Sequence, residues 1–137
     1  MDKKLLGLIV AFFVTFLLFT TVIIFHKPIT QAIRATEENT PSGESSLIFA
    51  WPLSEKADGV KQVSVDVFVR SKSNKPLSKK TVNVTTTLGN IQPVSNLSDS
   101  AGKTTFIISS TTAGIAQLTA TIDNSITLQK TLSVKFE

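Results

Sequence analysis

A run of basic residues is the part of this sequence with the clearest capacity for binding chemistry. Arg70, Lys72, Lys75, Lys79 and Lys80 follow one another with no acidic residue among them. Such a run is usually a solvated loop, but clustered cations also attract phosphate groups and anionic glycopolymers. We therefore keep both interpretations, a solvated loop and a patch for an anionic ligand. Aromatic residues are not interleaved with the run, so nucleic acid is not expected as a partner.

Catalytic chemistry finds little support in the sequence. The chain has no Cys and no Tyr, so the remaining nucleophiles are Ser and Thr. Ser71, Ser73 and Lys75 could be combined into a Ser–Lys pair, but no hydrolase motif surrounds them. His26 is the single histidine, lies beside an apolar run and has no partner in the sequence. We expect no enzymatic activity.

Metal and cofactor sites are not expected either. The absence of Cys removes disulfides and thiolate metal ligands. The acidic residues are sparse and scattered, so neither a glycosidase pair nor a calcium cage can be assembled from neighbours in the sequence. No glycine-rich phosphate loop occurs. The net charge of +4 is mild and points to no particular partner.

An apolar segment near the N-terminus predicts a membrane-spanning helix. Residues 5–25, "LLGLIVAFFVTFLLFTTVIIF", contain no charge and no proline. At about 1.5 Å per residue such a helix is roughly 31 Å long, which matches a hydrocarbon core of about 30 Å. Thr15, Thr20 and Thr21 can return their hydroxyls to the helix backbone. A cleaved signal peptide is the alternative, but its apolar region would normally be about 7–15 residues long.

The charges that flank this segment suggest an orientation. Lys3 and Lys4 precede it, and Lys27 and Arg34 follow it, so the two flanks are equal in basic residues. The N-terminal pair lies closer to the helix and is joined by the α-amino group, and the chain turns acidic after Arg34. We favour a cytoplasmic N-terminus, with everything after the helix outside the cell.

A short connector follows the helix. Pro28 disfavours simple continuation of the helix, although it would suit the first turn of a new one. Ile29 and Ile33 are four residues apart, so a short helix could rest them on the membrane surface. Residues 35–46 are small, acidic or turn-forming, and Pro41 and Gly43 interrupt any periodic pattern. This composition is typical of a flexible spacer.

The rest of the chain alternates with the period of a β-strand. Val63, Val65, Val67 and Val69 share one face, which indicates a half-buried strand. Turn signals at intervals of about 10–15 residues favour a sandwich over a βαβ unit. Further residues expected on the inward faces are Val82, Val84, Phe106, Ile108, Ala116, Leu118, Ala120, Ile122, Ile126, Leu128, Leu132, Val134 and Phe136.

Particular residues at the strand ends refine this expectation. "SLIFAWPLS", beginning at Ser46, is the first strand, and Pro52 places it at a sheet edge. We expect Trp51 to seal one end of the core. Gly102 can take the positive φ that a tight connection needs, and Asp99 can accept a hydrogen bond from the backbone two residues on.

Long stretches of this region resemble a known family. "VSVDVFVRSKSNKPLSKKTVNVTTTLGNIQP", "SDSAGKTTFIISSTTAGIAQLTATI" and "TLSVKF" are similar to the bacterial Ig-like domain of group 1, the invasin/intimin type. Lys75 and Ser78 depart from the pattern, because the family often has Gly there. The family's elements map onto Asn74–Val82, Leu88–Pro93, Ser98–Ser109 and Thr112–Ala120.

The resemblance implies an all-β Ig-like sandwich of Greek-key topology with about seven strands. In that family such domains form tandem stalks of adhesins, with recognition often in a separate tip domain. The predicted division is an N-terminus at 1–4, a transmembrane helix at 5–25, a juxtamembrane segment with a flexible linker at 26–46, and the Ig-like domain at 47–137.

Two functional hypotheses follow. The first is a non-enzymatic surface protein, anchored by one helix in the bilayer, that uses its Ig-like domain as a spacer or to bind protein or glycan through loops or a free sheet edge. Such a protein could also form homo-oligomers. The alternative is a structural subunit of a surface filament or membrane complex, packed through the Phe-rich helix. No pilin-like cleavage motif supports this second hypothesis.

Overall fold

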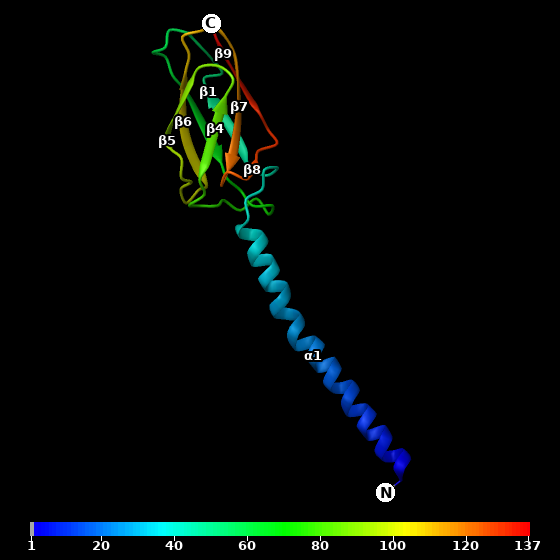
Figure 1. The fold of residues 1–137 in the computed structure, drawn as a ribbon. Helices are drawn as coiled ribbons and strands as arrows, with labels where there is room; N and C mark the ends of the chain where they lie inside the picture. Colours follow the sequence, from blue (N-terminus) through cyan, green and yellow to red (C-terminus); the bar gives the residue numbers. More distant parts are fainter. Residues whose placement is uncertain (1) are drawn as a thin grey trace. The chain divides into compact units, whose positions relative to one another are not determined.

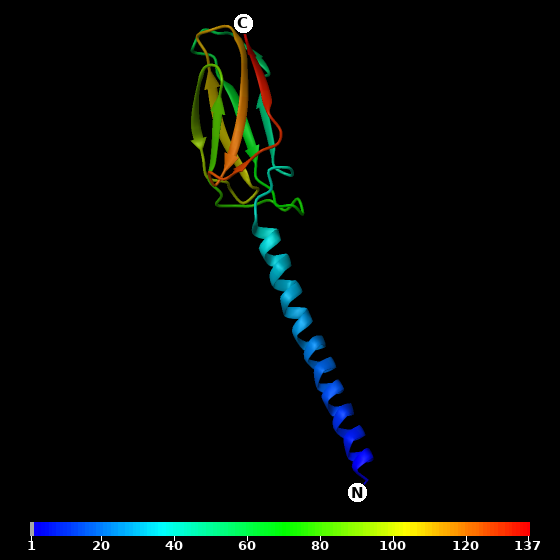
Figure 2. The same cartoon turned by 45° about the vertical axis from the view of Figure 1, so that its right-hand side comes forward.

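The computed structural model describes the backbone of residues 2–137, and the side chains throughout this range except at residues 25–37. By its contacts the chain divides into two compact units, Met1–Thr36 and Glu37–Glu137. Figure 1 and Figure 2 show a helix in the first part of the chain and a two-layered β structure in the second.

The helix α1 spans Lys3–Asn39. Its portion Lys3–Ile24 has 22 residues, a mean hydropathy of 2.7 and no buried residues, so it is long and apolar enough to cross a membrane. The hydroxyl of Thr15 donates to the carbonyl oxygen of Ala11 at 2.8 Å. Thr20 and Thr21 make the same bond to the carbonyls four residues before them. These polar side chains are therefore satisfied within the helix, as the sequence indicated.

The helix is longer than the apolar run predicted. It continues without a break through Pro28, which was expected to disfavour simple continuation, and ends at Asn39. A proline inside a helix removes one backbone donor and costs about 3 kcal/mol. The segment after Pro28 is rich in Gln, Ala, Arg and Glu, which are strong helix formers and offset part of this cost. The side chain of His26, the histidine beside the apolar run, lies outside the described side chains.

The second unit is a sandwich of two sheets. The first sheet has the strand order β1-β3-β6-β5, and the second has the order β2-β9-β7-β4, with β8 also paired to β7. The first sheet consists of β1 (Leu47–Trp51), β3 (Val63–Phe68), β6 (Lys103–Ser109) and β5 (Asn90–Ser95). The second consists of β2 (Ser54–Glu55), β9 (Leu132–Phe136), β7 (Gly114–Ile122), β4 (Val82–Thr86) and β8 (Ile126–Thr127).

This strand order is that of an immunoglobulin constant-type domain. Four strands in the order A-B-E-D face three in the order C-F-G. The chain repeatedly crosses between the sheets, and β2 continues the first strand into the opposite sheet, where it pairs with β9 in parallel. Seven strands have five or more residues, and β2 and β8 have two each. The predicted Ig-like sandwich is confirmed.

The core lies between the sheets and contains the residues that alternate inward. Val63, Val65, Val67 and Val69 are all fully buried, as their period of two predicted. The facing sheet contributes fully buried residues of β7, including Leu118 at its centre. Of the further residues expected to face inward, all are buried except Ile126 and Leu132, which are half-buried and pack against the core.

The position of Trp51 corrects one expectation. The first strand lies at the edge of its sheet as predicted, but Trp51 is 79% exposed and does not seal the core. Ile48 is the buried residue of β1 and Ala50 packs beside the core, so the odd-numbered residues of the strand face outward. Side chains alternate strictly along a strand, so Trp51 faces outward when Ile48 and Ala50 face inward. The prediction that Trp51 faces the core was therefore wrong by one position along the strand.

The turn between β5 and β6 has the chemistry expected from its sequence. A side-chain oxygen of Asp99 accepts hydrogen bonds from the backbone N–H of Ala101 at 2.8 Å and of Lys103 at 2.9 Å. Gly102 has a φ of 74°, and a Cβ there would lie 2.5 Å from the carbonyl oxygen of Val69. Both conformation and space therefore require glycine at this corner.

Residues 41–46, which we call the lead-in segment, belong to the sandwich. The backbone N–H of Ser42 donates to the carbonyl of Arg70 at 2.8 Å, and the N–H of Gln129 donates to the carbonyl of Gly43 at 3.0 Å. Ser46 is fully buried, and its hydroxyl accepts the N–H of Arg70 at 3.0 Å. The prediction of a flexible spacer is wrong over this segment. Its small residues, which indicated flexibility, allow the backbone to pack closely.

Candidate functional site

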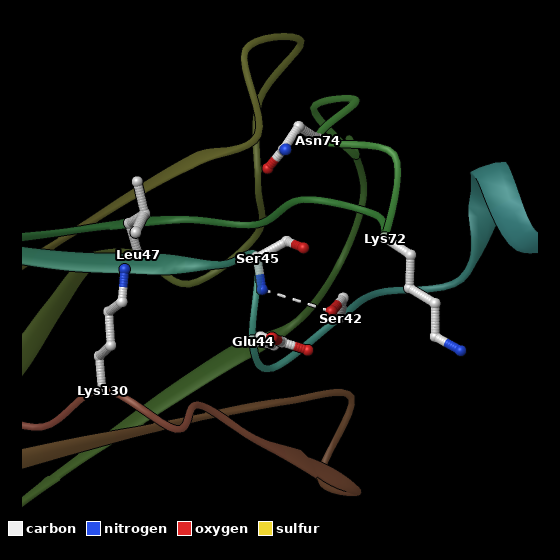
Figure 3. Close-up of a pocket in the computed structure, with 7 residues that line it drawn as sticks. All are labelled: Ser42, Glu44, Ser45, Leu47, Lys72, Asn74 and Lys130. Atoms are coloured by element: carbon white, nitrogen blue, oxygen red, sulfur yellow. Dashed lines mark hydrogen bonds between the residues drawn. The ribbon is translucent and has the colours of Figure 1, made fainter.

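A hollow lies at the end of the sandwich where the lead-in segment joins it (Figure 3). Three chain segments form its walls: the lead-in segment with the start of β1, the loop after β3, and the loop before β9. Its volume is about 460 Å³. The lining residues are Ser42, Glu44, Ser45, Leu47, Lys72, Asn74 and Lys130.

Local hydrogen bonds fix the walls of this hollow. The hydroxyl of Ser42 accepts the N–H of Ser45 at 3.3 Å, which holds the lead-in segment in a turn (Figure 3). In the loop after β3, the N–H of Ser71 donates to the carbonyl of Lys75 at 2.9 Å. Asn74 takes a φ of 62°, a conformation that Asn tolerates better than most residues. The loop is therefore a closed turn that presents Lys72 and Asn74 at the rim.

The chemistry of the hollow is that of recognition. Lys72 and Lys130 supply two exposed ammonium groups, Ser42 and Ser45 supply hydroxyls, and Glu44 supplies the single carboxylate of the lining set. In Figure 3 the amide of Asn74 points toward Ser45, and Lys130 extends toward Leu47. These groups can hydrogen-bond a polar ligand and attract negative charge. The lining set holds no histidine.

Only part of the basic run contributes to this hollow. Lys72 lines it, whereas Lys75 forms an ion pair with Glu38 at 3.2 Å on the surface. Lys80 forms an ion pair with Asp123 at 3.2 Å, so its charge is compensated. The five cations therefore do not share one hollow, and their role as an anionic-ligand patch stays a prediction.

The other two members of the run have structural surroundings. Lys79 is exposed and holds a left-handed backbone with a φ of 58°. Arg70 is half-buried, and within the described part of the chain its Nε has no hydrogen-bond partner. Lys130 was missed by sequence reasoning, because no local pattern places it beside Lys72. Only the crossing of strands between the sheets brings the two residues to one hollow.

Carboxyl groups with displaced pKa values lie outside the hollow. The pKa of Asp58 is lowered because its carboxylate accepts the backbone N–H groups of Lys61 and Val60, at 2.7 and 2.9 Å. The pKa of Glu137 is lowered by the Lys135 ammonium at 2.7 Å. Among the described residues, no three His, Cys, Asp or Glu side chains are grouped so that they could hold a metal ion.

The two-sheet sandwich and its strand order define the class of the protein, an Ig-like domain behind an apolar helix. The chain belongs to the bacterial Ig-like domain (group 1) family, whose model matches residues 52–136. The resemblance drawn from the sequence is thereby confirmed. No curated protein matches the chain.

Solved structures with the same fold include bacterial adhesins. Invasin, a bacterial integrin-binding protein, is 26% identical with a TM-score of 0.66, over 72% of this chain and 20% of invasin. The Yersinia pseudotuberculosis adhesin InvE is 24% identical with a TM-score of 0.63, over 72% of this chain and 28% of InvE. The D0-D1 domain of intimin is 24% identical with a TM-score of 0.60, over 72% of this chain and 49% of that structure. The chain thus matches one part of each protein.

Proposed function

We propose that this chain is a single-pass membrane protein that displays its Ig-like domain on the outside of a bacterial cell for adhesion. One observation carries this proposal: an apolar helix of 22 residues precedes an Ig-like sandwich of the adhesin type. The N-terminus lies in the cytoplasm, and the lipid bilayer holds the helix. The domain acts as a binding module for protein or glycan, or as a spacer that carries such a contact away from the surface.

The likeness to adhesins supports this role. Invasin binds integrins, and intimin has been solved in complex with the intimin-binding domain of its translocated receptor. Both contacts are with proteins, which favours a protein partner here as well. The domain has no clustered catalytic groups at its hollow, and a non-enzymatic role agrees with the Ig-like domains of these relatives.

Protease treatment of intact cells tests this proposal. We expect the Ig-like domain, detected through a C-terminal epitope, to be removed while a cytoplasmic marker stays intact. The same protein should remain in the membrane fraction after alkaline carbonate extraction, because its helix spans the bilayer. Complete protection of the epitope in intact cells, or release by carbonate, would contradict the proposal.

The hollow is our proposed contact for an anionic ligand, and charge reversal tests it. We expect the double variant Lys72→Glu and Lys130→Glu to weaken binding of fluorescent inorganic polyphosphate by roughly tenfold at low salt, since four units of charge change at one place. Fluorescence anisotropy with the full chain in detergent measures this. The control is Lys56→Glu with Lys61→Glu, which alters the net charge equally away from the hollow. Equal losses in both double variants would show that only net charge matters.

A further inference from the structure

Another hollow lies on the outer face of the first sheet. It forms where β5 and β6 meet the loop before β3, and its volume is about 280 Å³. Ile91 packs against the core, so its neighbours Asn90 and Gln92 lie on the outer face of β5. Ile107 and Ser109 lie on the outer face of β6, since the residues on either side of each are buried. Both pairs line the hollow.

The polar lining of this hollow is neutral. Asn90 and Gln92 from β5 and Gln62 from the loop before β3 each bring a carboxamide, and Ser109 adds a hydroxyl. Within the described residues, no side-chain or backbone group hydrogen-bonds to the three carboxamides, so they are available to a ligand. No lining residue carries a charge. The hollow therefore differs from the one at the lead-in segment, and its chemistry favours an uncharged ligand.

The walls of the hollow are held in place by the fold. The backbone N–H of Gly59 donates to the carbonyl of Ser110 at 2.9 Å, which fixes the loop before β3 against the end of β6. The carboxylate of Asp58 closes a turn in the same loop by accepting two backbone N–H groups. β5 and β6 are paired along the residues that line the hollow. Because the walls are already ordered, binding costs little conformational entropy.

An exposed indole lies on the same face of the sheet as the hollow. The strand register places Trp51 of β1, Ser64 of β3, Ile107 of β6 and Gln92 of β5 in one row across the sheet. With about 4.8 Å between neighbouring strands, this row is roughly 14 Å long. Trp51 is 79% exposed at one end, and the small, exposed Ser64 follows it. The row thus joins a flat aromatic group to the carboxamides of the hollow.

We propose that this face binds a short neutral oligosaccharide, with one sugar in the hollow and the others along the row toward Trp51. A carboxamide both donates and accepts hydrogen bonds, as sugar hydroxyls do, so the two match without charge. The flat indole packs against the C–H face of a sugar ring. Pockets that enclose a whole small ligand have about 300–1,000 Å³, more than this hollow, so the rest of the oligosaccharide lies outside it.

The geometry of the sheet favours a sugar over a peptide on this face. An extended peptide gains affinity by adding its main-chain hydrogen bonds to the edge of a sheet. The row instead crosses four strands whose main-chain groups already pair with one another, so a peptide lying along it finds no main-chain partner. This inference rests on the proposed function, because it assigns a ligand to the binding module proposed there. The adhesin relatives favour a protein partner for the domain as a whole, and this face adds a neutral glycan.

Binding of neutral trisaccharides to the full chain tests the inference. The protein is kept in a detergent without a sugar headgroup, and fluorescence anisotropy follows labelled cellotriose, maltotriose and triacetylchitotriose. We expect saturable binding of at least one of the three. Its affinity should change by less than about twofold between low and high salt, because salt screens charges and both partners are neutral here. A labelled neutral peptide rich in Ser and Asn should not bind at the same concentrations.

Matched variants locate the contact on the outer face of the first sheet. The double variant Asn90→Ala and Gln92→Ala should weaken trisaccharide binding roughly tenfold, because two hydrogen-bonding groups are lost. Trp51→Ala should weaken it by a similar factor, because the stacking surface is lost. The control for the carboxamides is the double variant Asn83→Ala and Gln117→Ala, which removes two exposed amides from the second sheet and should bind as the wild type does.

The control for Trp51 is Ile115→Ala, which removes an exposed apolar side chain from β7 and should leave binding unchanged. Binding of none of the trisaccharides, equal losses in the site and control variants, or binding of the peptide would overturn the inference. Protection of the C-terminal epitope in the protease experiment would instead overturn the proposed function, whether or not the trisaccharides bind.

Discussion

Replacing Leu118 by Ala is expected to lower the free energy of unfolding of the Ig-like domain by about 2–5 kcal/mol. Leu118 is fully buried at the centre of β7, where it pairs with Thr86 of β4 on one side and Leu132 of β9 on the other. Truncation therefore leaves a cavity between the two sheets that cannot collapse without moving three strands. Denaturant titration of the full chain in detergent, followed by the β-sheet signal in circular dichroism, measures the loss.

The matched control for this variant lies on the same strand. Ile115→Ala removes a side chain of the same size class that is 65% exposed, and its effect should stay within about 0.5 kcal/mol. If the two variants destabilise the domain equally, β7 does not have the alternation of inward and outward faces on which the sandwich depends.

Gly43→Ala is expected to destabilise the domain by roughly 1–3 kcal/mol, through overpacking. A Cβ at Gly43 would lie against the carbonyl oxygen of Thr127, closer than real Cβ atoms approach backbone. The carbonyl of Gly43 also accepts the N–H of Gln129, so the two segments cannot separate freely. The same denaturant titration applies.

Glu44→Ala is the control for the lead-in segment. Glu44 is exposed and follows Gly43 directly, so its truncation should change stability by no more than about 0.5 kcal/mol. A flexible linker would tolerate both substitutions equally. An unchanged stability in Gly43→Ala would therefore restore the flexible spacer that composition alone suggested.

The sandwich could be predicted from the sequence because its evidence is local. The buried side of a strand is indicated by alternation, as at Val63, Val65, Val67 and Val69. Turn residues such as Gly102 indicate where strands end. Where alternation was weak, as in the first strand, a shift of one residue placed Trp51 on the wrong face. A strand with apolar residues on both faces shows no alternation in polarity, so its sequence does not indicate which face is buried.

Features that depend on distant contacts could not be predicted. The small residues of the lead-in segment indicate flexibility unless the partners at Arg70 and Gln129 are known. Lys72 and Lys130 line the same hollow although they are far apart in the sequence. No spacing in the sequence indicates that the fold brings them close together. The sequence likewise could not show that Glu38 and Asp123 form ion pairs with two lysines of the basic run, Lys75 and Lys80.

The proposed topology, in which the helix spans a membrane and holds the Ig-like domain outside the cell, can be tested directly. Because the chain has no Cys, single cysteines can be introduced as topology reporters without further changes. Lys61→Cys lies on the exposed surface of the domain, and Lys3→Cys is at the first residue of the apolar helix. With a membrane-impermeant maleimide on intact cells, we expect labelling of Lys61→Cys at once and of Lys3→Cys only after permeabilisation. Labelling of Lys3→Cys with protection of Lys61→Cys, or protection of both, would contradict the proposed topology.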